Sequence, residues 1–125
     1  MAFENEQKEL SSVFSPNRET RRVKVPADLE IDRGEAVEIT TEGEGTALDE
    51  VGKLTDVANL EGYLLHRIDT TGGTACEADV VYTADWVNRR DVIKDDAIDM
   101  KALIKESRRC KLPLLDLENE QGKTA

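Results

Sequence analysis

The order of segments in the second half of the sequence constrains the fold most. Stretches with apolar residues at every second position, which is typical of β-strands, follow one another as far as Val92 and Ile93. One amphipathic helix is then predicted over residues 96–110, and a short apolar strand is predicted over residues 112–115. This order predicts a mainly β fold with one flanking α-helix that packs against a sheet.

The predicted helix is marked by its apolar face and by charges at both ends. Helical spacing places four apolar side chains on one face: Ala97, Met100, Leu103 and Ile104. Asp95 or Asp96 is expected to cap its start, where a carboxylate meets exposed N–H groups. Cations gather at its end, where they are favoured: Lys105, Arg108, Arg109 and Lys111. Pro113 prevents continuation of the helix.

The expected strands lie between polar turns rich in glycine. Strand patterns cover residues 22–25, 36–40, 62–68 and 78–83. Turns or loops are expected at residues 32–34, 41–46 and 69–73, which contain glycine. Residues 47–59 leave two alternatives open. Leu48, Val51 and Leu54 have helical spacing, but Gly52 interrupts them, and a short irregular segment fits equally well.

Composition limits both the core and the partners. The 125 residues are expected to form one domain, with a mainly aliphatic core because only 4% of residues are aromatic, and with Trp86 as its large anchor. The formal net charge of −10 argues against direct nucleic-acid binding and against anionic membranes. It suits a protein that meets a mixed or basic protein surface. The sequence shows neither a secretion signal nor a membrane span, so the protein is expected to be intracellular when made.

The residue types that carry catalysis do not form a known pattern. His66 is the single histidine and lies in an apolar segment, without the partners of a catalytic triad. Cys76 and Cys110 are expected to be free and buried, because two cysteines do not make a secreted disulfide framework. Asp95, Asp96 and Asp99 are explained by the helix start, without a metal. We therefore expect no enzyme, no cofactor and no metal site.

Residues 1–21 are polar and weakly patterned, and two interpretations remain open. They form either a frayed terminus or a flexible arm that orders against a partner. In the second interpretation the apolar side chains anchor the arm and the arginines add polar contacts; the candidate contact residues are Phe3, Leu10, Val13, Phe14, Arg18, Arg21 and Arg22. Because the strand pattern starts at Val23, removal of residues 2–17 is expected to leave the domain folded. The domain itself is expected at residues 22–118, followed by a flexible tail at residues 119–125.

An ordered set of short motifs resembles the head decoration proteins of tailed bacteriophages. The set spans roughly residues 20–117: an Arg-Gly turn at residues 32–37, strands near residues 62–65 and 78–82, an Asn-Arg segment at residues 88–89, a helix containing residues 99–104 and an apolar last strand. The sequence departs from the family in two places. After the helix the family often has a glycine followed by a small hydrophobic residue, where this chain has residues 109–113, which include Cys110 and Pro113. Residues 41–59 are also more acidic than the usual connecting strand.

The resemblance implies a fold, a role and a partner. The fold is a small β-barrel-like or β-tulip domain with a flanking helix and an extended N-terminal arm. The role is to bind the outer surface of the expanded head, commonly as homotrimers, and to stabilise contacts between major capsid protein subunits in the virion. If the arm instead belongs to the core, the capsid contacts are expected on the loops at residues 41–46 and 70–74. Two other classes stay open: an acidic soluble β-barrel adaptor and an inhibitor that mimics DNA.

Overall fold

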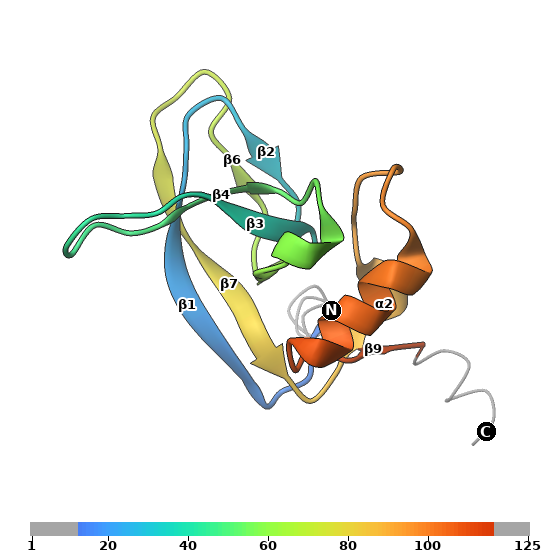
Figure 1. Cartoon of the computed structure of the whole chain (residues 1–125). Helices are drawn as coiled ribbons and strands as arrows, with labels where there is room; N and C mark the ends of the chain where they lie inside the picture. Colours follow the sequence, from blue (N-terminus) through green and yellow to red (C-terminus); the bar gives the residue numbers. More distant parts are fainter. Residues whose placement is uncertain (1–12, 117–125) are drawn as a thin grey trace, which may run out of the picture.

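The computed structural model describes residues 13–116 and shows a mainly β fold with one α-helix beside it (Figure 1). The strands are β1 (Arg18–Val25), β2 (Glu30–Ile31), β3 (Ala36–Thr41), β4 (Glu50–Lys53), β5 (Gly62–Leu64), β6 (Ile68–Asp69), β7 (Cys76–Ala84), β8 (Val87–Asn88) and β9 (Leu114–Leu115). The helices are the short 3₁₀ turns η1 (Val57–Asn59) and η2 (Arg89–Asp91) and the α-helix α2 (Met100–Arg109). The predicted fold class, a small β-barrel domain with one helix, is confirmed.

Five strands close into a barrel in the order β1-β4-β3-β5-β7. Strands β1 and β7 pair antiparallel along their length, with a bulge at Glu19 and Thr20. The barrel closes where Lys24 of β1 lies opposite Glu50 of β4, in the one parallel pairing of the barrel. Two small two-stranded sheets, β2-β6 and β8-β9, flank this barrel.

The alternation of side chains along the strands divides the core into two clusters. One cluster contains Leu64 and Val80 together with the buried valines of β1, β3 and β4. The residues adjacent to these on β5 and β7 are Tyr63 and Val81, and they belong to the second cluster, which α2 covers. Successive side chains of a strand point to opposite faces. The barrel strands therefore supply both the barrel interior and the platform for the helix.

The large aromatic anchors differ from the expected one. Trp86 is only partly buried and belongs to neither cluster. Tyr63 and Phe14 are instead the largest of the fully buried side chains in the described part of the chain. Trp86 stands in the bend between β7 and β8, where its backbone N–H and C=O bind Ser15. Its backbone thus contributes more to the described contacts than its side chain does.

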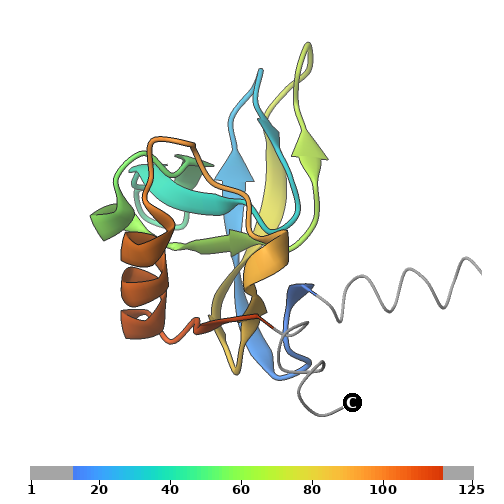
Figure 2. The same ribbon diagram turned by 90° about the vertical axis from the view of Figure 1, so that its right-hand side faces the viewer.

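Helix α2 packs on the barrel along one edge of the molecule (Figure 2). Leu103 and Ser107 are buried, and Met100 and Ile104 are partly buried, so the predicted apolar face is confirmed for Met100, Leu103 and Ile104. Ala97, predicted on the same face, is exposed and precedes the helix. The Tyr63 hydroxyl donates to Ser107 Oγ at 2.9 Å, and Ser107 Oγ in turn donates to the carbonyl of Leu112. This buried chain of hydrogen bonds joins the barrel, the helix and the segment that leads to β9.

The helix begins later than predicted, because its start is a separate turn. Residues 96–98 form a turn in which Asp95 Oδ1 accepts the Ala97 N–H at 2.8 Å, and Asp99 occupies the N-cap position. Asp95 therefore caps the turn, and neither Asp95 nor Asp96 caps the helix. The predicted end is confirmed within one residue, since α2 ends at Arg109 and Cys110 is its C-cap.

Two strand boundaries differ from the sequence patterns. Residues 50–53 form strand β4, and the buried Gly52 sits under Thr40, so neither the helical nor the irregular alternative is correct for these residues. The segment predicted as one strand over residues 62–68 bends at Leu65 and His66 and separates into β5 and β6. The bend directs β6 to pair with β2 outside the barrel.

The turn before β3 requires its glycine. Gly34 has a φ of +82°, a left-handed conformation that side chains rarely adopt. A Cβ atom here would also lie 2.6 Å from the carbonyl oxygen of Asp91. The predicted turn at residues 32–34 is confirmed, and the close approach brings residues 91–93 alongside the start of β3.

The N-terminal boundary predicted at residue 22 is wrong for residues 13–21. Strand β1 begins at Arg18, and Phe14 forms an antiparallel bridge with Val87. Ser15 Oγ donates to the carbonyl of Asn17 and accepts the N–H of Asp85 at 2.9 Å. Because these bonds connect the segment to the end of β7, removal of residues 13–17 would open the core. The expectation for residues 1–12, and for the tail at residues 119–125, lies outside the described residues.

Candidate functional site

Two of the predicted contact residues are core residues. Val13 is 2% exposed and Phe14 is fully buried in the cluster that α2 covers. Neither side chain is available to a partner while the domain is folded, so their assignment as capsid anchors was wrong. Their adjacency in sequence gave no periodic signal, and Phe14 is held by a pairing with the distant Val87 rather than by a local element. Phe3 and Leu10 lie outside the described residues.

The three predicted arginines bind within the chain. Arg18 donates to the carbonyl of Ser15 at 3.1 Å. Arg21 bridges Asp49 and Glu61, and Arg22 bridges Glu77 and Asp79 across β1 and β7; these arginines thus connect the strands of the barrel. The arginine cluster is explained by structure, although the side chain of Arg22 remains 54% exposed.

Asp49 connects the long β3-β4 hairpin to the barrel. Its Oδ1 accepts the N–H of Gly43 at 2.8 Å, and its Oδ2 binds Arg21. The Gly43 N–H and the Arg21 guanidinium both favour the ionised form, so they hold the pKa of the Asp49 carboxyl below its usual value. The loop between β3 and β4 projects away from the barrel in Figure 1, and this carboxylate anchors its base.

Ile93 is the one exposed large hydrophobic side chain among residues 13–116, with 40% of its surface accessible. Its backbone is held firmly, because its N–H donates to the carbonyl of Gly34 at 3.0 Å and its carbonyl accepts the N–H of Ala36 at 2.9 Å. A single exposed apolar side chain is common on protein surfaces, so Ile93 becomes a candidate contact only together with the groups around it.

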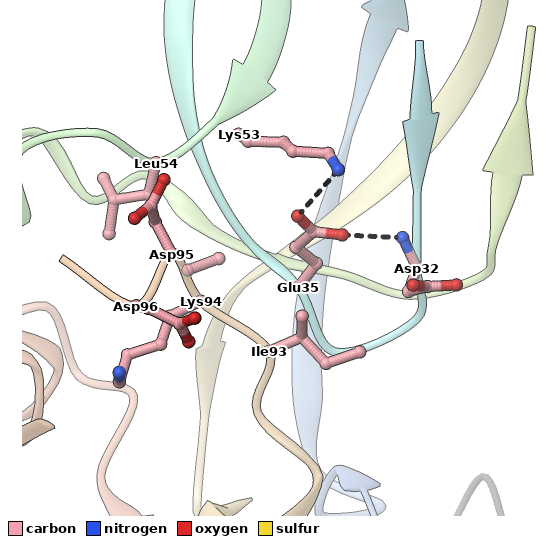
Figure 3. Close-up of a pocket in the computed structure, with 9 residues that line it drawn as sticks. Asp32, Glu35, Lys53, Leu54, Ile93, Lys94, Asp95 and Asp96 are labelled. Atoms are coloured by element: carbon pink, nitrogen blue, oxygen red, sulfur yellow. Dashed lines mark hydrogen bonds and ion pairs between the residues drawn. The ribbon is translucent and has the colours of Figure 1, made fainter. Parts of the chain in front are cut away.

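A charged hollow of about 350 Å³ lies on one side of Ile93 (Figure 3). Glu35 forms its floor: one carboxylate oxygen accepts the N–H of Asp32 at 2.9 Å, and the other lies 3.7 Å from Lys53 Nζ. Asp95 and Asp96 line the opposite side. Glu35 is buried but has two partners, so it is a structural carboxylate that fixes the turn before β3.

A second hollow of about 380 Å³ lies on the other side of Ile93 and contains His66 and Arg67. Arg67 binds Glu30 at 2.7 Å and reaches Asp32 at 3.4 Å. His66 is exposed, so its predicted place inside an apolar strand is wrong. Ile93 and these two charged hollows form what we call the Ile93 surface, an aliphatic centre with a polar surround. Such a surface suits contact with another protein.

The remaining reactive side chains do not converge on this surface. Both cysteines are free, as expected, but Cys76 is exposed at the start of β7 and Cys110 is only partly buried. Burial, with a contribution from Glu106, raises the pKa of the Cys110 thiol. Within residues 13–116 no group of three or more His, Cys, Asp or Glu side chains is arranged to hold a metal ion.

Two broader observations complete the description of the chain. None of the helices in residues 13–116 combines the length and the apolar character that a membrane crossing requires. Comparison with protein-family models, with curated proteins and with solved structures finds no match.

Proposed function

We propose that this chain is a head decoration protein of a tailed bacteriophage. In this role it binds the outer surface of the expanded head as trimers and stabilises contacts between major capsid protein subunits. The observation that supports the proposal best is the order of elements around the closed barrel. The Gly34 turn leads into β3, then β5, β7, the Asn88-capped η2, α2 and β9 follow, and a helix flanks the barrel as the resemblance implies.

The described surface offers contacts that suit a preformed lattice. The Ile93 surface presents an aliphatic side chain on a fixed backbone, and the β3-β4 loop projects from the barrel. Phe3 and Leu10 remain candidate anchors for the same lattice. Many copies of a weak binder on a repeating surface gain from multivalency, so each contact needs only modest affinity.

Co-sedimentation with expanded empty heads tests this proposal. The full chain is expected to pellet with heads in a saturable manner, because the lattice offers a fixed number of sites. Lack of saturable binding would contradict the proposed function. A protein that mimics DNA would instead displace DNA from a nuclease and leave the heads unbound, and a general adaptor would show no preference for heads.

A matched pair of substitutions tests the Ile93 surface in the same assay. Ile93→Asp is expected to weaken head binding at least tenfold, about 1.4 kcal/mol, because it places a charge at the centre of the contact. Ala97→Asp is the control, since Ala97 is exposed in the same connection between η2 and α2. Equal binding by both variants would remove the Ile93 surface from the contact. Light scattering of the free chain at several salt concentrations tests its association. A monomer or a weak trimer is expected away from the lattice, and a stable dimer at every salt concentration would count against the proposal.

A further inference from the structure

Helix α2 carries a row of cations on its exposed side. Lys101, Lys105 and Arg108 are all exposed, and their spacing of four and three residues places them on one face. We call this row the basic face. Arg109 adds a positive charge at the last position of the helix, and Lys111 adds one just beyond it. The row is notable because the whole chain has a formal net charge of −10.

The basic face lacks the ion pairs that other cations of this chain form. Six cations bind carboxylates elsewhere or at the helix end: Arg21, Arg22, Lys53, Arg67, Arg89 and Arg109. Lys101, Lys105 and Arg108 have no carboxylate partner within residues 13–116. Lys24, Lys94 and Lys111 likewise form no ion pair among the described residues, so the distinctive feature is that three such cations are neighbours on one helix face.

Helix stability does not explain the row. Cations are favoured in the last turn of a helix, which accounts for Arg108 and Arg109. Lys101 lies in the first turn, where the helix dipole disfavours a positive charge, and it repels Lys105 four residues later. The first turn of α2 contains no acidic residue. The arrangement therefore works against the helix, which points to a role in binding.

A small hollow accompanies the basic face. It has a volume of about 190 Å³, lies between η1 and α2, and is lined by Val57, Ala102, Lys105, Glu106 and Arg109. Val57 and Ala102 supply apolar lining, Arg109 pairs with the lining carboxylate of Glu106 at 3.6 Å, and Lys105 is the lining cation without a carboxylate partner among the described residues. A partner with one aliphatic side chain between carboxylates would fill the hollow and pair with the cations.

We propose that the basic face of α2 and the adjoining hollow bind an acidic protein segment that carries an aliphatic anchor. Nucleic acid fits less well, because its charge continues beyond the helix and meets a protein whose net charge is negative. That the segment belongs to the major capsid protein rests on the proposed function. The proposed binding of an acidic segment to these cations and this hollow does not depend on the proposed function.

Charge reversal at matched lysines tests the site with a defined probe. The probe is a fluorescent ten-residue peptide of glutamates with one central leucine, and anisotropy measures its binding. Lys105→Glu is expected to weaken binding at least tenfold at low salt, and Lys101→Glu with Lys105→Glu is expected to weaken it further. Lys24→Glu is the control, because it makes the same change of charge at an exposed lysine of β1. Equal loss in Lys105→Glu and Lys24→Glu, no binding by the original chain, or tighter binding of a DNA duplex would overturn the proposal.

Stability and head binding separate the possible failures. Lys101→Glu is expected to leave the thermal midpoint unchanged or to raise it, because it removes repulsion in the first helical turn. A lower midpoint would show that Lys101 serves the fold and would contradict the argument. With expanded heads, binding by Lys105→Glu equal to that of Lys24→Glu would exclude the basic face from the capsid contact while the proposed function stands. If Lys105→Glu loses peptide binding but no variant binds heads, the proposed peptide site is supported and the decoration role is refuted.

Discussion

The two phenylalanines of this chain are expected to respond to the same substitution in opposite ways. Phe14 is fully buried between the barrel and α2, so Phe14→Ala removes a large apolar side chain from the core and leaves a cavity. Substitutions of this kind cost about 3–5 kcal/mol. Since domains of this size unfold with roughly 5–15 kcal/mol, the loss is a large fraction of the total. The thermal midpoint is expected to fall by roughly 10–20 °C.

Urea denaturation followed by far-ultraviolet circular dichroism measures this loss directly. Phe14→Leu is a graded control, because it keeps an apolar side chain at the site and should cost roughly 1–1.5 kcal/mol. Phe3→Ala is the matched control, since the same atoms are removed from a residue that the sequence predicts to be a contact residue of the arm. We expect its free energy of unfolding to stay within about 0.5 kcal/mol of the original.

Head binding by the same variants distinguishes a core residue from a capsid anchor. Binding by Phe14→Ala is expected to follow its folded fraction, whereas Phe3→Ala is expected to weaken binding with the fold intact. The reasoning is refuted if the denaturation curve of Phe14→Ala overlaps that of the original chain. In that case Phe14 would belong to an arm, as the sequence pattern indicated.

Three further substitutions test the contacts between elements. Tyr63→Phe removes the hydroxyl that binds Ser107 and should cost about 1 kcal/mol by urea denaturation. Burial raises the pKa of Tyr63 above its usual value of about 10, so stability should fall above pH 10 as the unfolded chain ionises, and this fall should shrink in Tyr63→Phe. The pKa of Asp49 is lowered, so its contribution to stability should be present above about pH 4 and disappear as the pH falls below that value. Asp49→Asn should therefore reduce the fall of the thermal midpoint at acid pH, and an unchanged fall would contradict this. Leu103→Asp places a charge in the core and should cost at least about 3 kcal/mol, while an unchanged midpoint would show that α2 is not docked.

Local patterns predicted the parts of the fold that local chemistry determines. The periodicity around Leu103 identified the helix and its buried face, and the glycine in the turn at residues 32–34 identified the positive φ of Gly34. The acidic residues before the helix were less informative. A turn capped by Asp95 and a helix with Asp99 at its N-cap position produce the same cluster of aspartates, so the sequence pattern placed the helix start too early.

The sequence patterns did not predict features that depend on pairing between distant segments. Strand β4 was ambiguous because Gly52 has no side chain to show the alternation, and its burial comes from Thr40 in the neighbouring strand. Phe14 is buried by pairing with Val87, and Ile93 is exposed because residues 34 and 36 hold its backbone. To predict each of these features, one must know which distant segments pair, and local periodicity does not contain that information.

Segments near the two ends of the described residues meet at β8, and this affects folding during synthesis on the ribosome. Phe14 bridges to Val87, Ser15 binds Asp85 at a separation of 70 residues, and Val87 also pairs with Leu114 of β9. Ser15 therefore gains this partner only after 70 further residues have been made, and β8 gains its own partner only when β9 follows. Such long-range pairing slows folding and leaves the early barrel strands temporarily uncovered. We expect the fold to be complete only once β9 has emerged, and a chain stalled before β9 to be sensitive to proteases.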